Sequence, residues 1–409
     1  MTKHTAATVP LFLLLGMGSG IAAGMLSVAV PLAALHLGAT QAQTGLLRAL
    51  SGLGLLLAVA PAGFAVDRFG VRAVFLAGSL GTAVCLLGCA TAPEPATLAL
   101  AVLGEAVSRG LLFGALGAAF LQVLPRFGLH RVGWHKGAVS VGLGFLGPVL
   151  GGALLGWLSF AAVFAVGGLL ALAANLLLRL VNLPIPRGDG PADRVRARGF
   201  AGRGAIGVLL RQRDVRRCLA AEALVSATFA SFTTFIIVLA VAGRGLSPAA
   251  AAWLAGIEGL AYVVTAFTAA APLQRLPPAR AVRACALLVM PALAGLALAT
   301  QFASLLLCAA ALGVGLGLLT LVITTRAGTL PGEKGRITGL FMTATSLGGA
   351  AGPAFAGAVA AGFGTPAVFL FFVPLFGLLA APDLLLNSWR ARPRPFGADT
   401  STSALTEAP

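Results

Sequence analysis

Long runs of apolar residues alternate with short polar breaks along most of the chain. Many of these runs extend over about 20 residues, the length that a helix needs to cross the roughly 30 Å hydrocarbon core of a bilayer. The pattern predicts about twelve membrane-spanning helices and an all-α integral membrane protein. The helices are expected at residues 9–35, 44–66, 73–91, 96–124, 137–158, 160–181, 217–242, 249–271, 281–300, 302–325, 337–361 and 366–387.

Composition excludes a soluble protein. Hydrophobic residues make up 58% of the 409 residues and charged residues only 10%, and the mean hydropathy is +0.97. A soluble core has no use for so much apolar surface, whereas helices that face lipid do. We therefore expect membrane lipid as a constant partner, and we expect the protein to be a monomer.

The net charge of +16 at first suggests a nucleic-acid partner, but the distribution of the basic residues argues against one. Of the 28 lysines and arginines, all but Arg48, Arg109 and Arg244 fall in the segments on one side of the predicted spans or at the termini. This bias is the positive-inside pattern, which orients membrane proteins. It predicts a multi-pass protein of the inner or plasma membrane with both termini in the cytoplasm and no nucleic-acid partner.

A change of composition near the middle divides the chain into two halves. Residues 182–216 are rich in Arg, Gly and Asp and have little apolar periodicity, which is typical of a cytoplasmic linker. The predicted domains are an N-terminal six-helix bundle at 1–182, a basic linker at 183–216, a C-terminal six-helix bundle at 217–388 and a cytoplasmic tail at 389–409.

The two halves repeat each other with an offset of about 205 residues. Gly147-Pro148 in the fifth predicted span corresponds to Gly352-Pro353 in the eleventh, and Leu124-Pro125 corresponds to Leu330-Pro331. Composition alone does not place several features at one common offset. We therefore interpret the chain as an internal duplication with two pseudo-symmetric bundles.

A short charged segment, GFAVDRFGVR at 63–72, separates the second and third spans. We expect these ten residues to form a tight cytoplasmic turn, with Asp67 paired to an arginine or facing a helix N-terminus. The segment resembles the signature loop of the major facilitator superfamily, GxxxDRxGxR, except that Val71 stands where many members carry a base. The matching residues are Gly63, Asp67, Arg68, Gly70 and Arg72.

This resemblance implies a two-bundle secondary transporter that works by rocking of its halves. The fifth span adds a GPxxGG core, which resembles a motif of the superfamily's drug–proton antiporters and implies efflux, although Leu143 replaces a usual Gly. Proline bends a helix, and small residues let a neighbouring helix pack closely. The Gly-Pro motifs comprise Gly147, Pro148, Gly151 and Gly152 in the fifth span, and Gly348, Gly352 and Pro353 in the eleventh.

Two charged residues, Glu105 and Arg109, lie one helical turn apart in the middle of the fourth span. Charges at bilayer depth are costly, so both side chains should face the bundle interior. They form either a self-neutralising structural pair or a functional pair, with Glu105 as a titrating carboxylate and Arg109 as its partner or a contact for a substrate anion. In the superfamily's exporters, an arginine in this helix is often followed by a motif of the form RxxQG. Here Leu112 and Phe113 stand in place of the Gln and Gly of that motif.

Three further charged residues lie in or beside predicted spans. Glu258 stands alone in the eighth span, which suits proton binding. Arg48 lies at a similar depth in the second span, and it either contributes to a site at the seam between the halves or extends outward to the membrane surface. Glu222 begins the seventh span beside Arg216 and Arg217, which favours a salt bridge.

Other classes of function lack their motifs. The sequence contains no GxxxxGK[ST] and no GxSxG, and four histidines are too few for a metal cluster. We therefore expect no enzyme activity, no metal and no cofactor. The preferred hypothesis is proton-coupled efflux of a small amphipathic molecule by alternating access. Transport of an anionic solute bound by Arg48 and Arg109 remains open, as does a non-transporting sensor or lipid scramblase on the same fold.

Overall fold

A computed structural model describes residues 3–127, 132–180, 210–269, 278–329 and 334–381, and every regular element within them is a helix. The helices are α1 (Lys3–His36), α2 (Gln41–Phe69), α3 (Val71–Ala90), α4 (Pro95–Phe127), α5 (Val132–Val141), η2 (Gly142–Leu146), α6 (Gly147–Leu155), α7 (Phe160–Leu180), α10 (Arg213–Val238), η4 (Leu239–Gly243), α11 (Pro248–Thr268), α13 (Pro278–Leu298), α14 (Phe302–Thr329), α15 (Lys334–Phe363) and α16 (Thr365–Ala380). Ten helical stretches in the described part are long and apolar enough to cross a membrane, and α2, bent by 45° near Pro61, makes an eleventh. The shorter apolar helix α16 completes the predicted set.

The segment that was expected to form a ten-residue turn is almost entirely helical. Helix α2 continues through Asp67 to Phe69, and α3 begins at Val71. Only Gly70 leaves the helical conformation, with φ of 79°, a value that glycine adopts without steric cost. The predicted turn was therefore too long, because charged residues at a helix end do not interrupt its backbone hydrogen bonds.

The fifth span is a single rod built from three pieces. Between α5 and α6, the five residues of η2 adopt a π-helical conformation. Pro148, the second residue of α6, lacks the backbone N–H that would continue the regular hydrogen-bond pattern, which accounts for the local widening. A second π-helical turn, η4, follows the C-terminal end of α10.

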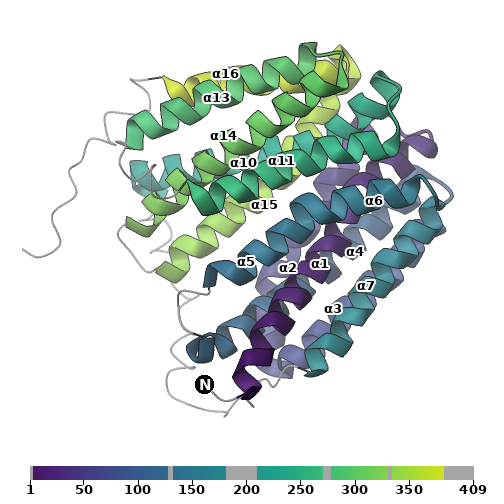
Figure 1. Cartoon of the computed structure of the whole chain (residues 1–409), viewed down its shortest axis with the longest axis vertical. Coiled ribbons are helices and arrows are strands. Elements are labelled where there is room, and N and C mark those ends of the chain that lie inside the picture. Colours follow the sequence, from purple (N-terminus) through teal and green to yellow (C-terminus); the bar gives the residue numbers. More distant parts are fainter. Residues whose placement is uncertain (1–2, 128–131, 181–209, 270–277, 330–333, 382–409) are drawn as a thin grey trace, which may run out of the picture.

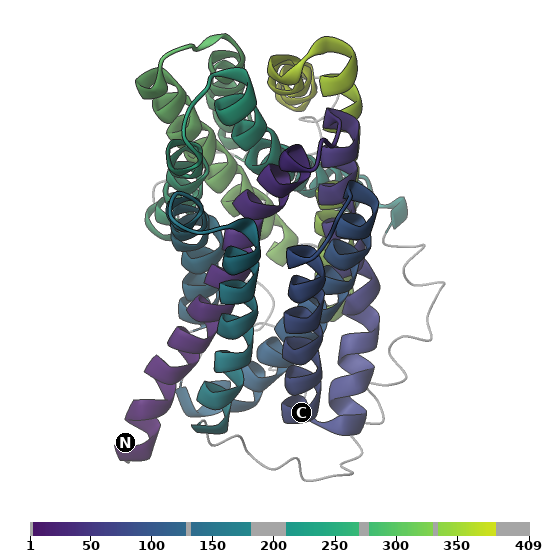
Figure 2. The same cartoon turned by 90° about the vertical axis from the view of Figure 1, so that its right-hand side faces the viewer.

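The helices form two groups (Figures 1 and 2). Helices α1 to α7 make one group, here the N bundle, and α10 to α16 make the other, here the C bundle. Helix α1 crosses obliquely between them in Figure 2, and its residues Val28 and Leu32 belong to the hydrophobic core of the C bundle. The segments 183–216 and 389–409 lie outside or largely outside the described residues, as does the 274–277 segment of the second half.

The bundles meet along two helix crossings, here called seams. In each seam, glycines allow the two backbones to approach closely. In the first, a Cβ on Gly52 of α2 would lie 2.7 Å from the backbone nitrogen of Ala350 and 2.8 Å from the carbonyl carbon of Gly349. In the second, a Cβ on Gly259 of α11 would lie 1.9 Å from the carbonyl oxygen of Gly144. Gly259 follows Gly52 by 207 residues and Gly349 follows Gly144 by 205. The two seams are therefore related by the same offset as the sequence repeat.

The two ends of the molecule differ. At the end here called the hairpin end, short turns at residues 37–40, 91–94, 156–159 and 244–247 join consecutive helices. The opposite end, here called the basic end, carries Arg68, Arg72 and Arg213. Figure 1 shows the bundles close together at the hairpin end and diverging toward the basic end, where the N-terminus lies.

Burial along the two central helices agrees with this divergence. Val28 of α1 is 0% exposed against the C bundle, whereas Leu14, on nearly the same face four turns nearer the basic end, is 49% exposed. Along α10, residues 230–240 are buried on every side, while Ala220 near the basic end is exposed. The structure is therefore a conformation that is closed at the hairpin end and open toward the basic end.

The two bundles differ in their interiors. The C bundle has one continuous hydrophobic core that contains Phe232, Phe235 and Phe376. The N bundle has two separate cores, one around Phe12 and Phe75 toward the basic end and one around Phe164 and other residues toward the hairpin end. The side chains that lie between these two hydrophobic clusters are described in the next section.

Candidate functional site

A layer of polar side chains divides the two hydrophobic cores of the N bundle. Its members come from four helices and are Ser19 of α1, Ser79 and Thr82 of α3, Glu105 and Arg109 of α4, and Asn175 of α7. The side-chain amide of Asn175 donates to the Ser79 hydroxyl, and that hydroxyl donates to the carbonyl oxygen of Phe75 at 2.9 Å. These bonds tie α7 to α3 at the depth of the charged pair.

An ion pair lies at the centre of this polar layer. The Arg109 Nε atom donates to the Glu105 Oε1 atom at 2.8 Å. Glu105 is 3% exposed, and the Arg109 side chain is 13% exposed. Both side chains therefore face the bundle interior, as the cost of burying charge in a membrane predicts.

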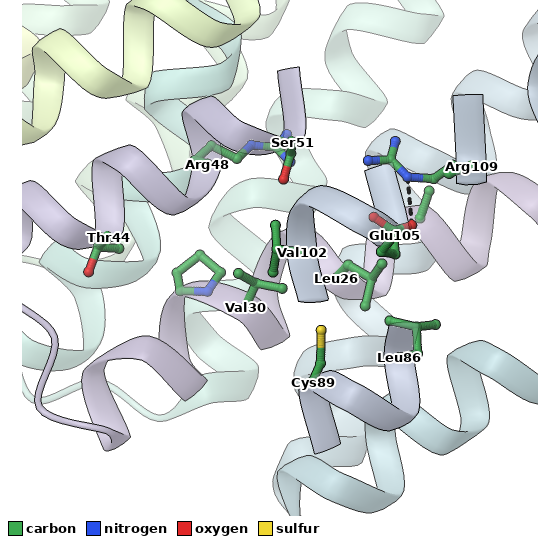
Figure 3. Close-up of a pocket in the computed structure, with 12 residues that line it drawn as sticks. Leu26, Val30, Thr44, Arg48, Ser51, Leu86, Cys89, Val102, Glu105 and Arg109 are labelled. Atoms are coloured by element: carbon green, nitrogen blue, oxygen red, sulfur yellow. Dashed lines mark hydrogen bonds and ion pairs between the residues drawn. The ribbon is translucent and has the colours of Figure 1, made fainter. Parts of the chain in front are cut away.

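Two small cavities lie on either side of the ion pair. The first, cavity 1, has about 20 Å³ of space and is lined by α1, α2, α3 and α4 (Figure 3). The second, cavity 2, has about 10 Å³. Glu105 and Arg109 line both cavities, as do Ala23, Leu26 and Leu86, so the ion pair borders each of them.

Cavity 2 contains hydroxyl groups without partners. Ser19 and Thr82 line it, and their buried oxygens form no hydrogen bond within the described part of the chain. Buried hydroxyl groups of this kind are commonly satisfied by ordered water, and roughly 10–15 Å³ is enough for one molecule. Cavity 2 is at the lower limit of that size.

Arg48 lines cavity 1 together with Ser51, one turn farther along α2. In Figure 3 its side chain extends toward Ser51 and the ion pair and away from Thr44, so it does not reach outward to the hairpin end. It interacts electrostatically with Arg109 and Glu105, but it forms no hydrogen bond or salt bridge within the described residues. Arg48 lies three residues after Gly45 and four before Gly52, the glycines that contact α15, so it is on nearly the same face of α2 while its side chain lines cavity 1. A role for Arg48 at the seam stays a prediction.

Glu258 lies in the core of the C bundle and is 0% exposed. Neither of its carboxyl oxygens has a hydrogen-bond partner among the described residues. The backbone of α14 approaches it closely, since a Cβ on Gly313 would lie 2.1 Å from the Glu258 carbonyl oxygen. Tyr262, one turn along α11, interacts electrostatically with both Glu258 and Glu222 of α10.

In the internal repeat, the position of Glu258 is equivalent to that of a serine in the N bundle. The contact of Gly54 in α2 with Ala106 in α4 recurs 207 residues later as Ala261 in α11 with Gly313 in α14. The same offset relates Ser51 to Glu258. The N-bundle residues Arg48, Glu105 and Arg109 correspond by this offset to Ala255, Leu312 and Leu316.

Glu222 lies closer to the basic end than Glu258. Its Oε1 atom accepts a hydrogen bond from the Thr345 hydroxyl of α15 at 2.9 Å. This bond joins α10 to α15 within the C bundle. Thr345 was not predicted as a partner, because a single threonine in an apolar span has many possible environments.

The signature residues lie at the basic end. Asp67 and Arg68 are exposed, and the Arg68 guanidinium lies 5.4 Å from the centre of the Phe69 ring. Asp67 forms no ion pair or hydrogen bond within the described residues, so the expected partner is not found there. Gly63 has no atom within 4 Å of a Cβ built on it. Gly63 therefore makes no close helix contact within the described residues in this conformation.

The Gly-Pro motifs each lie between two other helices. Gly147 and Gly151 pack against α1, whereas Gly152 packs against Ala252 of α11. In the second half, Gly348 and Gly352 pack against α10, and the carbonyl oxygen of Pro353 would lie 2.4 Å from a Cβ on Gly45 of α2. Each motif thus connects a central helix of its own bundle to the opposite bundle.

The predicted charged residues do not share one cavity. Glu105, Arg109 and Arg48 come together inside the N bundle, while Glu258 and Glu222 lie in the C bundle and do not line cavity 1. A single site shared by the two bundles stays a prediction. Sequence analysis also missed Ser19, Ser51 and Thr82, whose only signal was a hydroxyl group within an apolar span.

Comparison with known families identifies the class of protein. The model of the Major Facilitator Superfamily matches residues 12–247 and 223–406. These two matches together cover nearly the whole chain, so the chain belongs to the Major Facilitator Superfamily and is a multi-pass membrane transporter. A comparison with curated protein sequences gives no match.

Solved structures agree in fold. A bacterial homologue of the human lysosomal transporter Spinster, in an inward-facing and unoccupied conformation, has a TM-score of 0.77 at 15% identity, and the alignment covers 93% of this chain and 96% of that one. The nucleoside transporter NupG has a TM-score of 0.74 at 14% identity, with 93% and 98% covered. The human organic anion transporter MFSD10 has a TM-score of 0.66 at 18% identity, with 92% and 98% covered. At these identities the likeness concerns the fold alone.

Proposed function

We propose that this transporter couples the export of a small amphipathic molecule to the entry of protons. The observation that carries the proposal is Glu258, which is fully buried and has no hydrogen-bond partner among the described residues. An ionised carboxylate without a counter-ion is costly in an apolar core. A bound proton removes that cost, so the side chain is suited to carry one.

The position of Glu258 connects proton binding to the conformational change. The adjacent residue, Gly259, lies in the seam against Gly144 of the N bundle. When the seam parts at the hairpin end, the surroundings of α11 change, and Glu258 gains a route to solvent on that side. Closure of the seam would then seal the protonated side chain, which is consistent with the burial of Glu258.

Two other features bear on the direction of transport and on the substrate class. The GPxxGG core of the fifth span resembles that of drug–proton antiporters, which favours export. The surface of α1 that separates from the C bundle toward the basic end includes the exposed apolar residue Leu14. An amphipathic solute suits such a surface better than a highly polar one.

We further infer the orientation and the domain limits. The protein lies in the inner or plasma membrane of the cell. Its basic end faces the cytoplasm, since basic residues favour that side of the membrane. The bundles then correspond to residues 1–182 and 217–388, with both termini and the 183–216 linker in the cytoplasm.

The test uses purified protein in liposomes with a pH gradient. The probe is the amphipathic compound that most raises the unfolding temperature in a thermal-shift screen. Glu258→Gln is expected to abolish accumulation driven by the gradient while leaving counterflow at zero gradient, because a neutral amide mimics the protonated acid. Binding of the probe should depend on pH between 6 and 8 in the wild type and lose that dependence in the variant.

Glu94→Gln provides the matched control, because Glu94 is an exposed acid in a turn at the hairpin end. It should transport as the wild type does. Accumulation at the wild-type level in Glu258→Gln would refute proton coupling through this residue.

A second candidate function is transport of an anionic solute. It is favoured by Arg48, which has no salt-bridge partner among the described residues, whereas Arg109 is held by Glu105. Arg48→Gln would then abolish transport of one organic anion. Gradient-driven export of an amphipathic compound that continues in Arg48→Gln would favour the first candidate instead.

A further inference from the structure

Cavity 1 contains an unbalanced positive charge. Three charged side chains line it: Arg48, Arg109 and Glu105. Glu105 is bonded to Arg109 at 2.8 Å, and together these two are neutral. Arg48 remains, with a net charge of +1 for the cavity.

A guanidinium group cannot relieve this imbalance by losing its proton, because it stays charged under all conditions that a protein experiences. Burying a charge without a partner is strongly unfavourable. Arg48 is half-buried at about one-quarter of the length of α2 from the hairpin end. In Figure 3 its guanidinium group turns into the bundle rather than toward that end. Arg48 forms no hydrogen bond or ion pair within the described residues, so a negative partner bound in cavity 1 would stabilise its charge.

The size and lining of the cavity define that partner. A buried water needs roughly 10–15 Å³ by the same measure, and cavity 1 offers about 20 Å³. Its apolar walls include Leu26, Val30 and Val102, which suit a weakly hydrated ion. The Ser51 hydroxyl forms no hydrogen bond within the described residues, so it is available as a second donor beside the guanidinium group.

We propose that cavity 1 is a binding site for a single small monovalent anion, such as chloride, held by the Arg48 guanidinium group and the Ser51 hydroxyl. All the residues that line the site come from α1, α2, α3 and α4 of the N bundle. It does not depend on proton coupling through Glu258, and an anion there neutralises Arg48 throughout the transport cycle.

The first experiment measures thermal unfolding of the purified protein in detergent, without a pH gradient or a transported solute. Sodium chloride is compared with sodium gluconate at equal ionic strength, since gluconate is too large for the cavity. Chloride is expected to raise the unfolding temperature in a saturable manner at millimolar concentrations. Equal effects of the two salts would overturn the proposal.

Variants test the residues of the site with radiolabelled chloride. Arg48→Gln is expected to weaken chloride binding by at least about tenfold, whereas Arg48→Lys, which keeps the charge, should retain most of it. Arg179→Gln removes an exposed arginine from the same bundle and should leave binding unchanged. Unaltered binding in Arg48→Gln would overturn the proposal.

A variant of opposite sign excludes a merely structural role for Arg48. Glu105→Gln removes the negative charge from the cavity and raises its net charge to +2, so chloride should bind more tightly. A loss of chloride binding in this variant, with the protein folded, would contradict the electrostatic argument.

The carboxylate of a transported solute offers the same chemistry as a free anion. Competition of labelled chloride with bromide, acetate and benzoate distinguishes the two sources. Displacement by bromide but not by benzoate supports a site for a free small anion. Benzoate binding that exceeds halide binding would overturn the proposal in favour of a site for an organic solute.

Discussion

The N bundle and the C bundle share one backbone arrangement, but they hold charge in different ways. The N bundle divides its core with a polar layer, in which Glu105 and Arg109 neutralise each other at 2.8 Å. At the corresponding positions the C bundle has Leu312 and Leu316, both 0% exposed. At the position equivalent to Ser51 of the N bundle, the C bundle carries an acid, Glu258.

This difference separates two chemical behaviours. A lone carboxyl group in an apolar core reaches neutrality by binding a proton, and it can release that proton when its surroundings change. A guanidinium group has no such route and needs a negative partner. On the proposals made above, the duplication left the C bundle suited to a mobile proton and the N bundle suited to fixed charge and a bound anion.

The largest expected effect comes from breaking the N-bundle ion pair. Arg109→Ala leaves Glu105 buried without its partner, which should lower the free energy of unfolding by about 3–5 kcal/mol. The double variant Glu105→Leu, Arg109→Leu reproduces the residues of the C bundle and should recover most of the loss. Denaturant unfolding in detergent provides the measurement, with the two single variants completing the cycle.

A double variant as unstable as Arg109→Ala would show that the polar layer as a whole, rather than the unpaired charge, sets the stability of the N bundle. Equal stability of Arg109→Ala and the wild type would remove the distinction between the bundles altogether.

An intermediate effect is expected at the seams. A Cβ on Gly259 would lie 1.9 Å from a backbone oxygen, and overpacking of this kind typically costs about 1–3 kcal/mol. Gly259→Ala should therefore shift the equilibrium away from the conformation closed at the hairpin end by about tenfold, or about 1.4 kcal/mol. Spin labels at positions 94 and 247, one on each bundle, would report the change in distance.

The two seams also allow a graded comparison. Gly52→Ala in the other seam meets its nearest atom at 2.7 Å and should have a smaller effect, while Gly349→Ala meets nothing within 4 Å and should have none. A larger shift from Gly349→Ala than from Gly259→Ala would contradict the assignment of the seam contacts.

The smallest effect is expected at the basic end. Asp67 is exposed and has no partner among the described residues, so Asp67→Asn should leave stability unchanged and slow the transport cycle several-fold. Exchange rates in liposomes would measure this, with Asp214→Asn, another exposed acid at the same end, as the control. Wild-type exchange in Asp67→Asn would remove the reason to assign a conformational role to the signature segment.

Much of the fold was predictable because its main signal is long apolar runs, which depend little on tertiary contacts. The duplication was also visible, since Gly147-Pro148 and Gly352-Pro353 keep their spacing. The burial of Glu105, Arg109 and Glu258 followed from the cost of exposing charge to lipid.

The arrangement of the site was not predictable to the same degree. Arg48 shares a face of α2 with the seam glycines Gly45 and Gly52, but the direction in which its long side chain turns from that face depends on tertiary contacts. The polar layer could not be predicted from the sequence, because its members Ser19, Thr82 and Asn175 come from three different helices. A hydroxyl group in a span has the same sequence signature whether it faces lipid, its own backbone or a cavity.

The glycine contacts between α2 and α15, and between α11 and η2, bring main chains together with no side chains between them. A substitution on one helix therefore cannot be absorbed by a change of rotamer on the other. The two halves of the gene must accept changes at these crossings jointly, so a duplication that is free to diverge inside each bundle stays constrained along the lines where the bundles meet.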